Sequence, residues 1–293
     1  SITNRLASLR IAQYRGIENY AVASTSGDMS MIGRAMSMDN LHQSFYIDVS
    51  AGYKKHHEQK SHVTSTGFGY DRIIRNQDGK YLVGALASFG KLSADQNAQN
   101  DDGDLYSLTG YVSYERLNTE GWEFLSYLTV GHLNNERSIT PEINLGMQEF
   151  DEKQWMLMSS NALKYNVPLP SGKFQYAFKP MLLADIGVTH NQDTSSTYFK
   201  REGLTDWSVD LGLGLEYAAF STDASYSLQL TAKRNVYHSE DTVGVNLSHA
   251  NGFIQYELAK DRAMQFNLNA LTSQELTQSL SIDLMAGLGA NTE

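Results

Sequence analysis

Residues 207–217 alternate strictly between apolar and polar side chains, and this alternation is the strongest constraint on the fold. The apolar set is Trp207, Val209, Leu211, Leu213, Leu215 and Tyr217; the other set is Ser208, Asp210, Gly212, Gly214 and Glu216. A period of two is the period of a β-strand, because successive side chains point to opposite faces. Aromatic residues at both ends of the apolar face, with small or charged residues opposite, are typical of a lipid-facing wall around a polar lumen.

The same pattern recurs along the chain and predicts twelve strands. Their approximate ranges are 44–54, 62–74, 80–92, 104–117, 122–138, 152–167, 173–190, 206–219, 224–235, 243–259, 262–272 and 279–290. In the tenth range, a shift of the apolar face near Asn251-Gly252 suggests a bulge. We therefore expect an all-β membrane protein, namely a twelve-stranded, antiparallel, up-and-down transmembrane β-barrel. A soluble barrel or sandwich is the alternative, since its strands also alternate.

The connections between these strands are sorted by length. Turn residues make short links between strands 2–3, 4–5, 6–7, 8–9 and 10–11, at 76–79, 118–121, 170–172, 221–223 and 260–261. The intervening connections are mostly longer and more polar, as at 94–102, 138–149, 191–205 and 237–242. Short turns on one side and long loops on the other are typical of an outer-membrane barrel. With twelve strands, both termini of this segment are expected on the short-turn, periplasmic side.

Composition excludes several other classes of protein. The mean hydropathy of −0.40 and the lack of an apolar run of about 18 residues argue against a helical membrane protein. A net charge of −10 provides no basic face for nucleic acid. The chain has no cysteine, and His56-His57-Glu58 is not followed by further ligands at a recognisable spacing. We therefore expect no metal and no cofactor.

The N-terminal residues differ from the rest of the chain. Ile2, Leu6 and Leu9 recur at helical spacing and predict one short α-helix in or near the pore. Its basic residues are Arg5, Arg10 and Arg15, whose five-residue spacing distributes them around the helix. We expect residues 1–43 to form this helix and a connector, and residues 44–293 to form the barrel.

Carboxylates dominate the face of the strands that is expected to point into the lumen. The lumen-facing acids are predicted to be Asp48, Asp71, Glu115, Asp185, Asp210, Glu216, Glu257 and Asp283, against Lys54, Lys179 and Lys233. Such an excess creates a negative field inside a low-dielectric wall. The hypothesis is that the N-terminal helix plugs the pore by pairing its three arginines with these acids. The alternative is that the arginines are solvated on a periplasmic helix.

A short arginine-containing helix followed by twelve alternating strands resembles the C-terminal translocator domain of a classical, monomeric, type V autotransporter. The segment Asn4-Arg5-Leu6-Ala7-Ser8-Leu9-Arg10 is similar to the motif that often precedes those barrels. The resemblance covers essentially the whole chain and is one of architecture more than of sharp motifs. One departure is the final segment 287–293, which has no aromatic residue where such barrels usually end in Phe or Trp.

The resemblance implies an outer-membrane barrel that mediates secretion and surface anchoring of an N-terminal passenger. Its implied partners are outer-membrane lipid, the passenger, the outer-membrane assembly machinery and periplasmic chaperones, with the barrel itself a monomer. No catalytic residue is predicted, although some members of this class cut their own passenger free inside the barrel. The alternatives are a small porin or solute channel and an outer-membrane phospholipase. The Ser/His pairs Ser61-His62 and Ser248-His249 face opposite ways within a strand, and no G-x-S-x-G elbow occurs.

Overall fold

The computed structural model describes residues 43–56, 59–76, 79–96, 99–116, 119–139, 147–169, 175–195, 199–201, 203–220, 224–239, 242–247, 252–257, 264–277 and 280–291. All regular secondary structure in these ranges is β-strand. None of their segments is a helix long and apolar enough to span a membrane. The predicted N-terminal helix, with Arg5, Arg10 and Arg15, lies outside the described residues.

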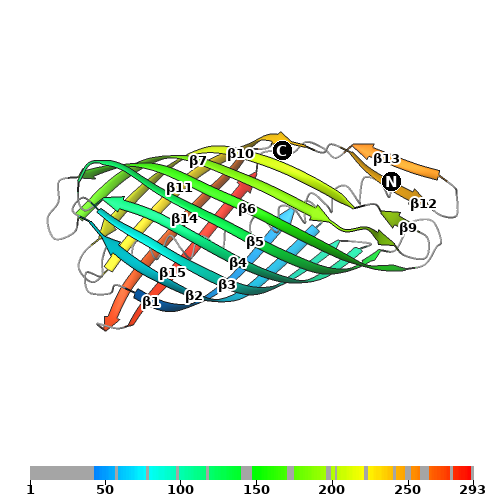
Figure 1. Cartoon of the computed structure of the whole chain (residues 1–293), viewed down its shortest axis with the longest axis horizontal. Coiled ribbons are helices and arrows are strands. Elements are labelled where there is room, and N and C mark those ends of the chain that lie inside the picture. Colours follow the sequence, from blue (N-terminus) through cyan, green and yellow to red (C-terminus); the bar gives the residue numbers. More distant parts are fainter. Residues whose placement is uncertain are drawn as a thin grey trace.

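Eleven strands of the described ranges form one antiparallel sheet that follows the order of the chain. They are β1 (Gln43–His56), β2 (Gln59–Arg75), β3 (Gly79–Gln96), β4 (Gln99–Arg116), β5 (Gly121–Ile139), β6 (Gln148–Leu169), β7 (Gln175–Asn191), β10 (Leu204–Phe220), β11 (Ala224–His238), β14 (Met264–Thr277) and β15 (Leu280–Asn291). Figure 1 shows that this sheet is long, tilted and strongly curled. The all-β, antiparallel prediction is therefore confirmed, and eleven of the twelve predicted strand ranges fall in this sheet.

The tenth predicted strand, 243–259, is the exception, because β11 pairs directly with β14. Its residues form β12 (Thr242–Leu247) and β13 (Gly252–Glu257) instead. These two strands join β8 (Thr194–Ser195) and β9 (Phe199–Arg201) in a small four-stranded sheet. The register opposes Val243 to Tyr256 and Val245 to Ile254. Directly opposed residues of an antiparallel pair lie on the same face of the sheet. The hairpin therefore places both apolar sets on one face, whereas a single continuous strand would place them on opposite faces.

The connections of the main sheet differ between its two ends. At one end, the links β2–β3, β4–β5, β6–β7, β10–β11 and β14–β15 contain two to five residues. We call this the short-turn end. At the other end, β1–β2 and β3–β4 are joined by two residues each, whereas β5–β6, β7–β10 and β11–β14 are joined by 140–147, 192–203 and 239–263. The last two of these links include the small sheet. The predicted loop 94–102 is wrong, since β3 and β4 stay paired as far as Gln96 and Gln99.

Local chemistry explains two of the short turns. Gly79 N donates to Asn76 Oδ1 at 2.7 Å, and Asn76 N donates to Gly79 O at 3.0 Å, so the two residues close the β2–β3 turn. In the β4–β5 turn, Gly121 has a φ of +143°, which side chains rarely tolerate. An odd number of strands places the start of β1 at the short-turn end and the end of β15 at the opposite end. Both termini would lie at the same end of the sheet only if the sheet had one more strand.

Exposed apolar side chains alternate with buried polar ones along the main sheet. On β10, Leu213 is 64% exposed, whereas Asp210 and Glu216 are 5% and 6% exposed. Trp207 and Tyr217 lie at the two ends of the exposed row, ten residues apart. This spacing corresponds to about 33 Å along a strand and about 25 Å across a barrel tilted by about 40°, which is the height of an outer-membrane apolar band.

Aromatic pairs border this exposed face at both levels. Near the short-turn end, ring centroids are 4.9 Å apart for Phe45–Tyr70, 4.8 Å for Tyr81–Tyr114, 5.1 Å for Trp122–Tyr165 and 6.0 Å for Tyr176–Tyr217. Toward the other end, the pairs are Phe89–Tyr106 at 5.2 Å and His132–Trp155 at 4.2 Å. Two aromatic levels that flank an aliphatic band are the pattern of a membrane-embedded β-wall.

Substituting Leu213 by arginine is expected to lower the free energy of unfolding by about 2–4 kcal/mol, because Leu213 lies near the middle of the exposed band. The control is Gln192→Arg, at an exposed position beyond the end of β7, where the cost should be about 0–1 kcal/mol. Urea titration in phospholipid vesicles, read by heat-modifiable gel mobility, measures both. Equal costs at the two positions would mean that this face does not contact lipid.

Candidate functional site on the inner face of the sheet

Five charged side chains gather on the buried face near the short-turn end. This short-turn cluster consists of Glu115 on β4, Glu123 on β5, Lys164 on β6, Lys179 on β7 and Glu216 on β10. Each is no more than 6% exposed. Three carboxylates face two ammonium groups, so the fully ionised cluster carries one excess negative charge.

The ion pairs of the short-turn cluster cross intervening strands. Lys164 Nζ lies 2.5 Å from Glu216 Oε2, although β7 separates their strands. Lys179 Nζ lies 2.9 Å from Glu123 Oε2, with β6 between them. Gln229 Nε2 also donates to Glu216 Oε2 at 3.1 Å. Inward side chains converge when a sheet curls, so long lysines reach over the neighbouring strand and tie four strands together.

A second group of polar residues occupies the opposite end of the same face. This loop-end cluster consists of Asp101, Asn135, Arg137 and Glu152, of which Arg137 is only 1% exposed. Arg137 Nε donates to Asp101 Oδ1 at 2.7 Å, and its Nη1 lies 3.3 Å from Glu152 Oε1. Asn135 Nδ2 donates to Asp101 Oδ1 at 3.3 Å. One guanidinium therefore holds two buried carboxylates from the strands on either side, a geometry that its planar fork permits.

Between the two clusters the inner face carries further polar contacts. Lys233 pairs with Asp185, and Asn235 Nδ2 donates to Asp210 Oδ1 at 2.7 Å. Hydroxyl pairs join neighbouring strands, with 2.6 Å between the Oγ atoms of Ser88 and Ser107 and 2.8 Å between the Oγ1 atoms of Thr109 and Thr129. These buried polar groups thus have partners across the sheet, which offsets the cost of their burial.

Tyr111 extends from β4 across β3 toward Asp71 on β2. Its hydroxyl donates to Asp71 Oδ2 at 3.4 Å. The strand between them has Gly84 at this position, where a Cβ would lie 2.3 Å from the Tyr111 Oη. The tyrosine ring therefore fills the space that a side chain at Gly84 would occupy.

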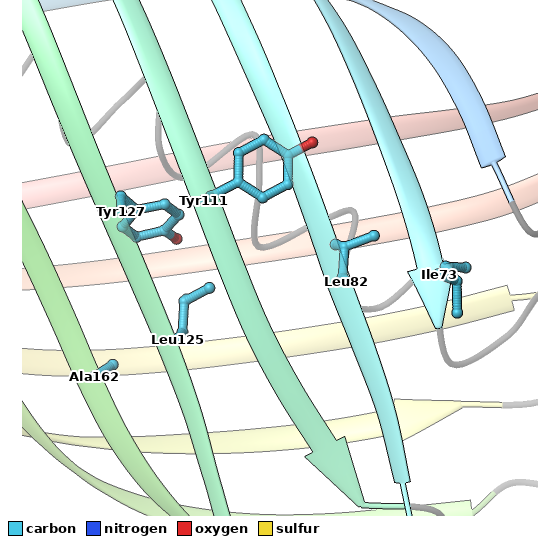
Figure 2. Close-up of a cluster of buried hydrophobic side chains, with 6 residues drawn as sticks. All are labelled: Ile73, Leu82, Tyr111, Leu125, Tyr127 and Ala162. Carbon is cyan, nitrogen blue, oxygen red and sulfur yellow. The ribbon is translucent and has the colours of Figure 1, made fainter. Parts of the chain in front are cut away.

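Apolar side chains also line the inner face, in two separate layers. One cluster consists of Ile73, Leu82, Tyr111, Leu125, Tyr127 and Ala162, and Figure 2 shows these side chains on neighbouring strands. The other consists of Leu92, Leu105, Leu133, Met156 and Met158. The inward-pointing side chains of β5 change in character from the short-turn end to the other end. They are, in chain order, charged Glu123, apolar Leu125 and Tyr127, hydroxyl-bearing Thr129, apolar Leu133, and polar Asn135 and Arg137. The wall is therefore charged at both ends, with apolar layers around a hydroxyl layer in the middle.

The structure places the predicted acids in three groups. Asp71, Glu115, Asp185, Asp210 and Glu216 are all buried on the inner face of the main sheet. Asp48 in β1 and Asp283 in β15 belong to the same sheet, but their side chains lie outside the described part. Glu257 ends β13 of the small sheet, so its assignment to the main inner wall is wrong, for the same reason as the strand 243–259.

Sequence reasoning missed five of the charged residues on this face. They are Asp101, Glu123, Arg137, Glu152 and Lys164. Glu123 and Arg137 were obscured because large apolar residues occur on both faces of β5, and Asp101 fell in a predicted loop. For Glu152 and Lys164 the usable signal was the parity of β6, since both alternate with exposed Trp155 and Leu163. No group of three or more His, Cys, Asp or Glu side chains in the described ranges is arranged to hold a metal ion.

This fold, with its two-faced wall, resembles those of known proteins. Residues 3–293 match the family model of the vacuolating cytotoxin autotransporter VacA, C-terminal domain. The translocator domain of autotransporter NalP from Neisseria meningitidis superposes with a TM-score of 0.66 at 12% identity, over 91% of each chain. The β domain of the Bordetella autotransporter BrkA gives 0.58 at 13% identity, over 85% of this chain and 92% of that one. The transport unit of AIDA-I from Escherichia coli gives 0.54 at 11%, over 92% and 93%.

The fold and its two faces therefore define an autotransporter translocator domain, a β-barrel class that resides in the bacterial outer membrane. The chain belongs to the family of the VacA autotransporter C-terminal domain, because the model of that family matches nearly the whole length of the chain. A comparison with curated protein sequences found no match.

Proposed function

We propose that this domain mediates secretion and surface anchoring of an N-terminal passenger across the bacterial outer membrane. The observation that carries the proposal is the two-faced wall, apolar and bordered by aromatic pairs outside, charged and hydrogen-bonded inside. Such a wall is stable only with lipid on one side and polar contents on the other. Catalysis by the domain itself is not part of the proposal, and neither is a cofactor.

The proposed barrel is closed and has twelve strands, formed by residues 44–293. Closure removes the unpaired sheet edges that hydrocarbon does not tolerate. In the main sheet β1 and β15 run in the same direction. An even number of strands would allow the first and last to pair antiparallel, as in bacterial outer-membrane barrels. It would also bring both termini to the short-turn end, which we assign to the periplasm.

Residues 1–43 form the proposed pore plug and the link to the passenger. Arg5, Arg10 and Arg15 would supply positive charge to an inner face that carries an excess of carboxylates. Arginine suits this role, because its guanidinium binds carboxylates through two parallel hydrogen bonds and stays charged. The acids proposed to receive it are Asp71, Glu115, Asp185, Asp210 and Glu216, with Asp48 and Asp283 from β1 and β15.

The proposed partners follow from the same assignment. Outer-membrane lipid covers the apolar face, and the passenger precedes residue 1. The outer-membrane assembly machinery and periplasmic chaperones deliver the barrel, which works as a monomer. Cleavage of the passenger inside the barrel is a secondary proposal, which would show as a passenger fragment released from intact cells.

Display of an epitope-tagged passenger fused ahead of Ser1 tests the function. We expect an external protease to remove the tag from intact cells, while heat-modifiable mobility shows that the barrel is folded in the membrane. The matched control is the same protease treatment of permeabilised cells that carry the same fusion, which gives the total amount of digestible passenger. A tag that resists protease on intact cells, beside a correctly folded barrel, would exclude translocation.

A further inference from the structure

We propose that the open barrel conducts small monovalent cations in preference to anions, through a negative potential that extends along its inner wall. The proposal rests on the proposed function, because selectivity requires the water-filled pore of a translocator. It goes beyond that function, since passage of a passenger requires no preference between K⁺ and Cl⁻. Three observations carry it: the charge excess, its distribution and the buried acceptors that lack donors.

The first observation is the number of charges on the described inner face. Eight carboxylates are buried there, namely Asp71, Asp101, Glu115, Glu123, Glu152, Asp185, Asp210 and Glu216. The cationic groups on the same face are Arg137, Lys164, Lys179 and the half-buried Lys233. Whatever the pairing, four carboxylates exceed the available cations. Enclosed by a low-dielectric wall, this excess attracts cations and repels anions over the whole interior.

The second observation is the distribution of the excess along the pore. The short-turn cluster and the loop-end cluster each carry one more carboxylate than cation. Between them, the described inner face carries the carboxylates Asp71, Asp185 and Asp210 and the cation Lys233, which is an excess of two negative charges. An ion therefore meets no level at which the described wall is net positive. Pores that use rings of Asp and Glu for cation selectivity follow the same principle.

The third observation concerns buried oxygen atoms without a hydrogen-bond donor. Within the described ranges these include Glu115 Oε2, Asn135 Oδ1 and Asn166 Oδ1. The three side chains are 6%, 2% and 2% exposed. An unsatisfied buried acceptor costs about 1–3 kcal/mol, so a stable barrel needs donors or cations at these positions. All three atoms are acceptors with partial negative charge, so they add to the negative potential of the wall.

Single-channel recording of the full chain in planar bilayers under a KCl gradient tests the proposal. The unchanged chain is compared with the variant Arg5→Gln/Arg10→Gln/Arg15→Gln, which should conduct more if the arginines plug the pore. We expect the reversal potential to correspond to a K⁺ permeability at least about threefold that of Cl⁻. Equal permeabilities, a preference for Cl⁻ or absence of current from both forms would overturn the proposal.

Charge substitutions test whether the inner wall is the source of the cation selectivity. Glu115→Gln/Asp210→Asn keeps the shape of both side chains, halves the described excess and should lower the permeability ratio about twofold. The matched control is Glu136→Gln on the exposed face of β5, which removes an acidic charge but should leave the ratio unchanged. Only variants with heat-modifiable mobility are recorded. If Glu136→Gln changes the ratio as much as the inner pair does, the inner wall is not the source.

The failure of this proposal can be separated from failure of the proposed function. A passenger that reaches the surface through a barrel without cation preference contradicts the selectivity alone. A cation-selective pore that leaves its passenger in the periplasm contradicts translocation alone.

Discussion

Replacing Arg137 by methionine is expected to lower the free energy of unfolding by about 3–5 kcal/mol, because one guanidinium compensates two buried carboxylates. Asp101 and Glu152 approach it from β4 and β6 at 2.7 Å and 3.3 Å. Methionine keeps most of the volume and removes the charge. The two acids would then remain close together in the wall without the cation between them, and burial makes this costly.

An exposed ion pair provides the control for Arg137→Met. Lys91 Nζ lies 4.0 Å from Asp104 Oδ1, and their side chains are 72% and 45% exposed. Pairs of this kind contribute about 0–1 kcal/mol, so Lys91→Met should change the stability little. Urea titration of the refolded barrel in vesicles measures both variants. A further variant, Arg137→Met with Asp101→Asn and Glu152→Gln, should recover part of the loss. Equal stability of Arg137→Met and Lys91→Met would contradict the role assigned to Arg137.

Most strands could be predicted from the sequence because one face of each carries exposed apolar side chains and the other face carries buried polar ones. β10 is the clearest case, since from Trp207 to Tyr217 each apolar residue is separated from the next by a polar residue or a glycine. The prediction weakened where the inner face is itself apolar. Leu125 and Leu133 of β5 are 3% and 2% exposed on the inner side, so the periodic contrast that reveals a strand is lost there.

Long-range pairing was the part that local periodicity could not determine. Whether residues 242–257 insert between β11 and β14 or form a hairpin depends on the competition between two ladders, and both ladders satisfy the local alternation. For a related reason, only three of the five members of the short-turn cluster were predicted, and Glu123 and Lys164 were missed. Parity indicates which face Lys164 occupies, but its contact with Glu216 across β7 depends on how strongly the sheet curls.

Substituting Gly84 by valine is expected to lower the free energy of unfolding by about 3–5 kcal/mol, since it forces the Tyr111 ring out of its place. A Cβ at this position would lie 2.3 Å from Tyr111 Oη and 2.7 Å from the carbonyl oxygen of Tyr70. The ring is 4% exposed and belongs to an apolar cluster of the inner face. Its displacement would remove that packing together with the hydrogen bond to Asp71.

Gly110→Val is the matched control for Gly84→Val, because Gly110 is exposed on the adjacent strand and a Cβ there would meet nothing within 4 Å. Its stability should stay within about 0.5 kcal/mol of the unchanged barrel. The double variant Gly84→Val/Tyr111→Ala separates the clash with the ring from the rest of the effect. Once the ring is absent, valine at position 84 should cost less than it does in the unchanged barrel, although the contact with the Tyr70 carbonyl remains. Additive losses for Gly84→Val and Tyr111→Ala would mean that the ring and the glycine are not coupled.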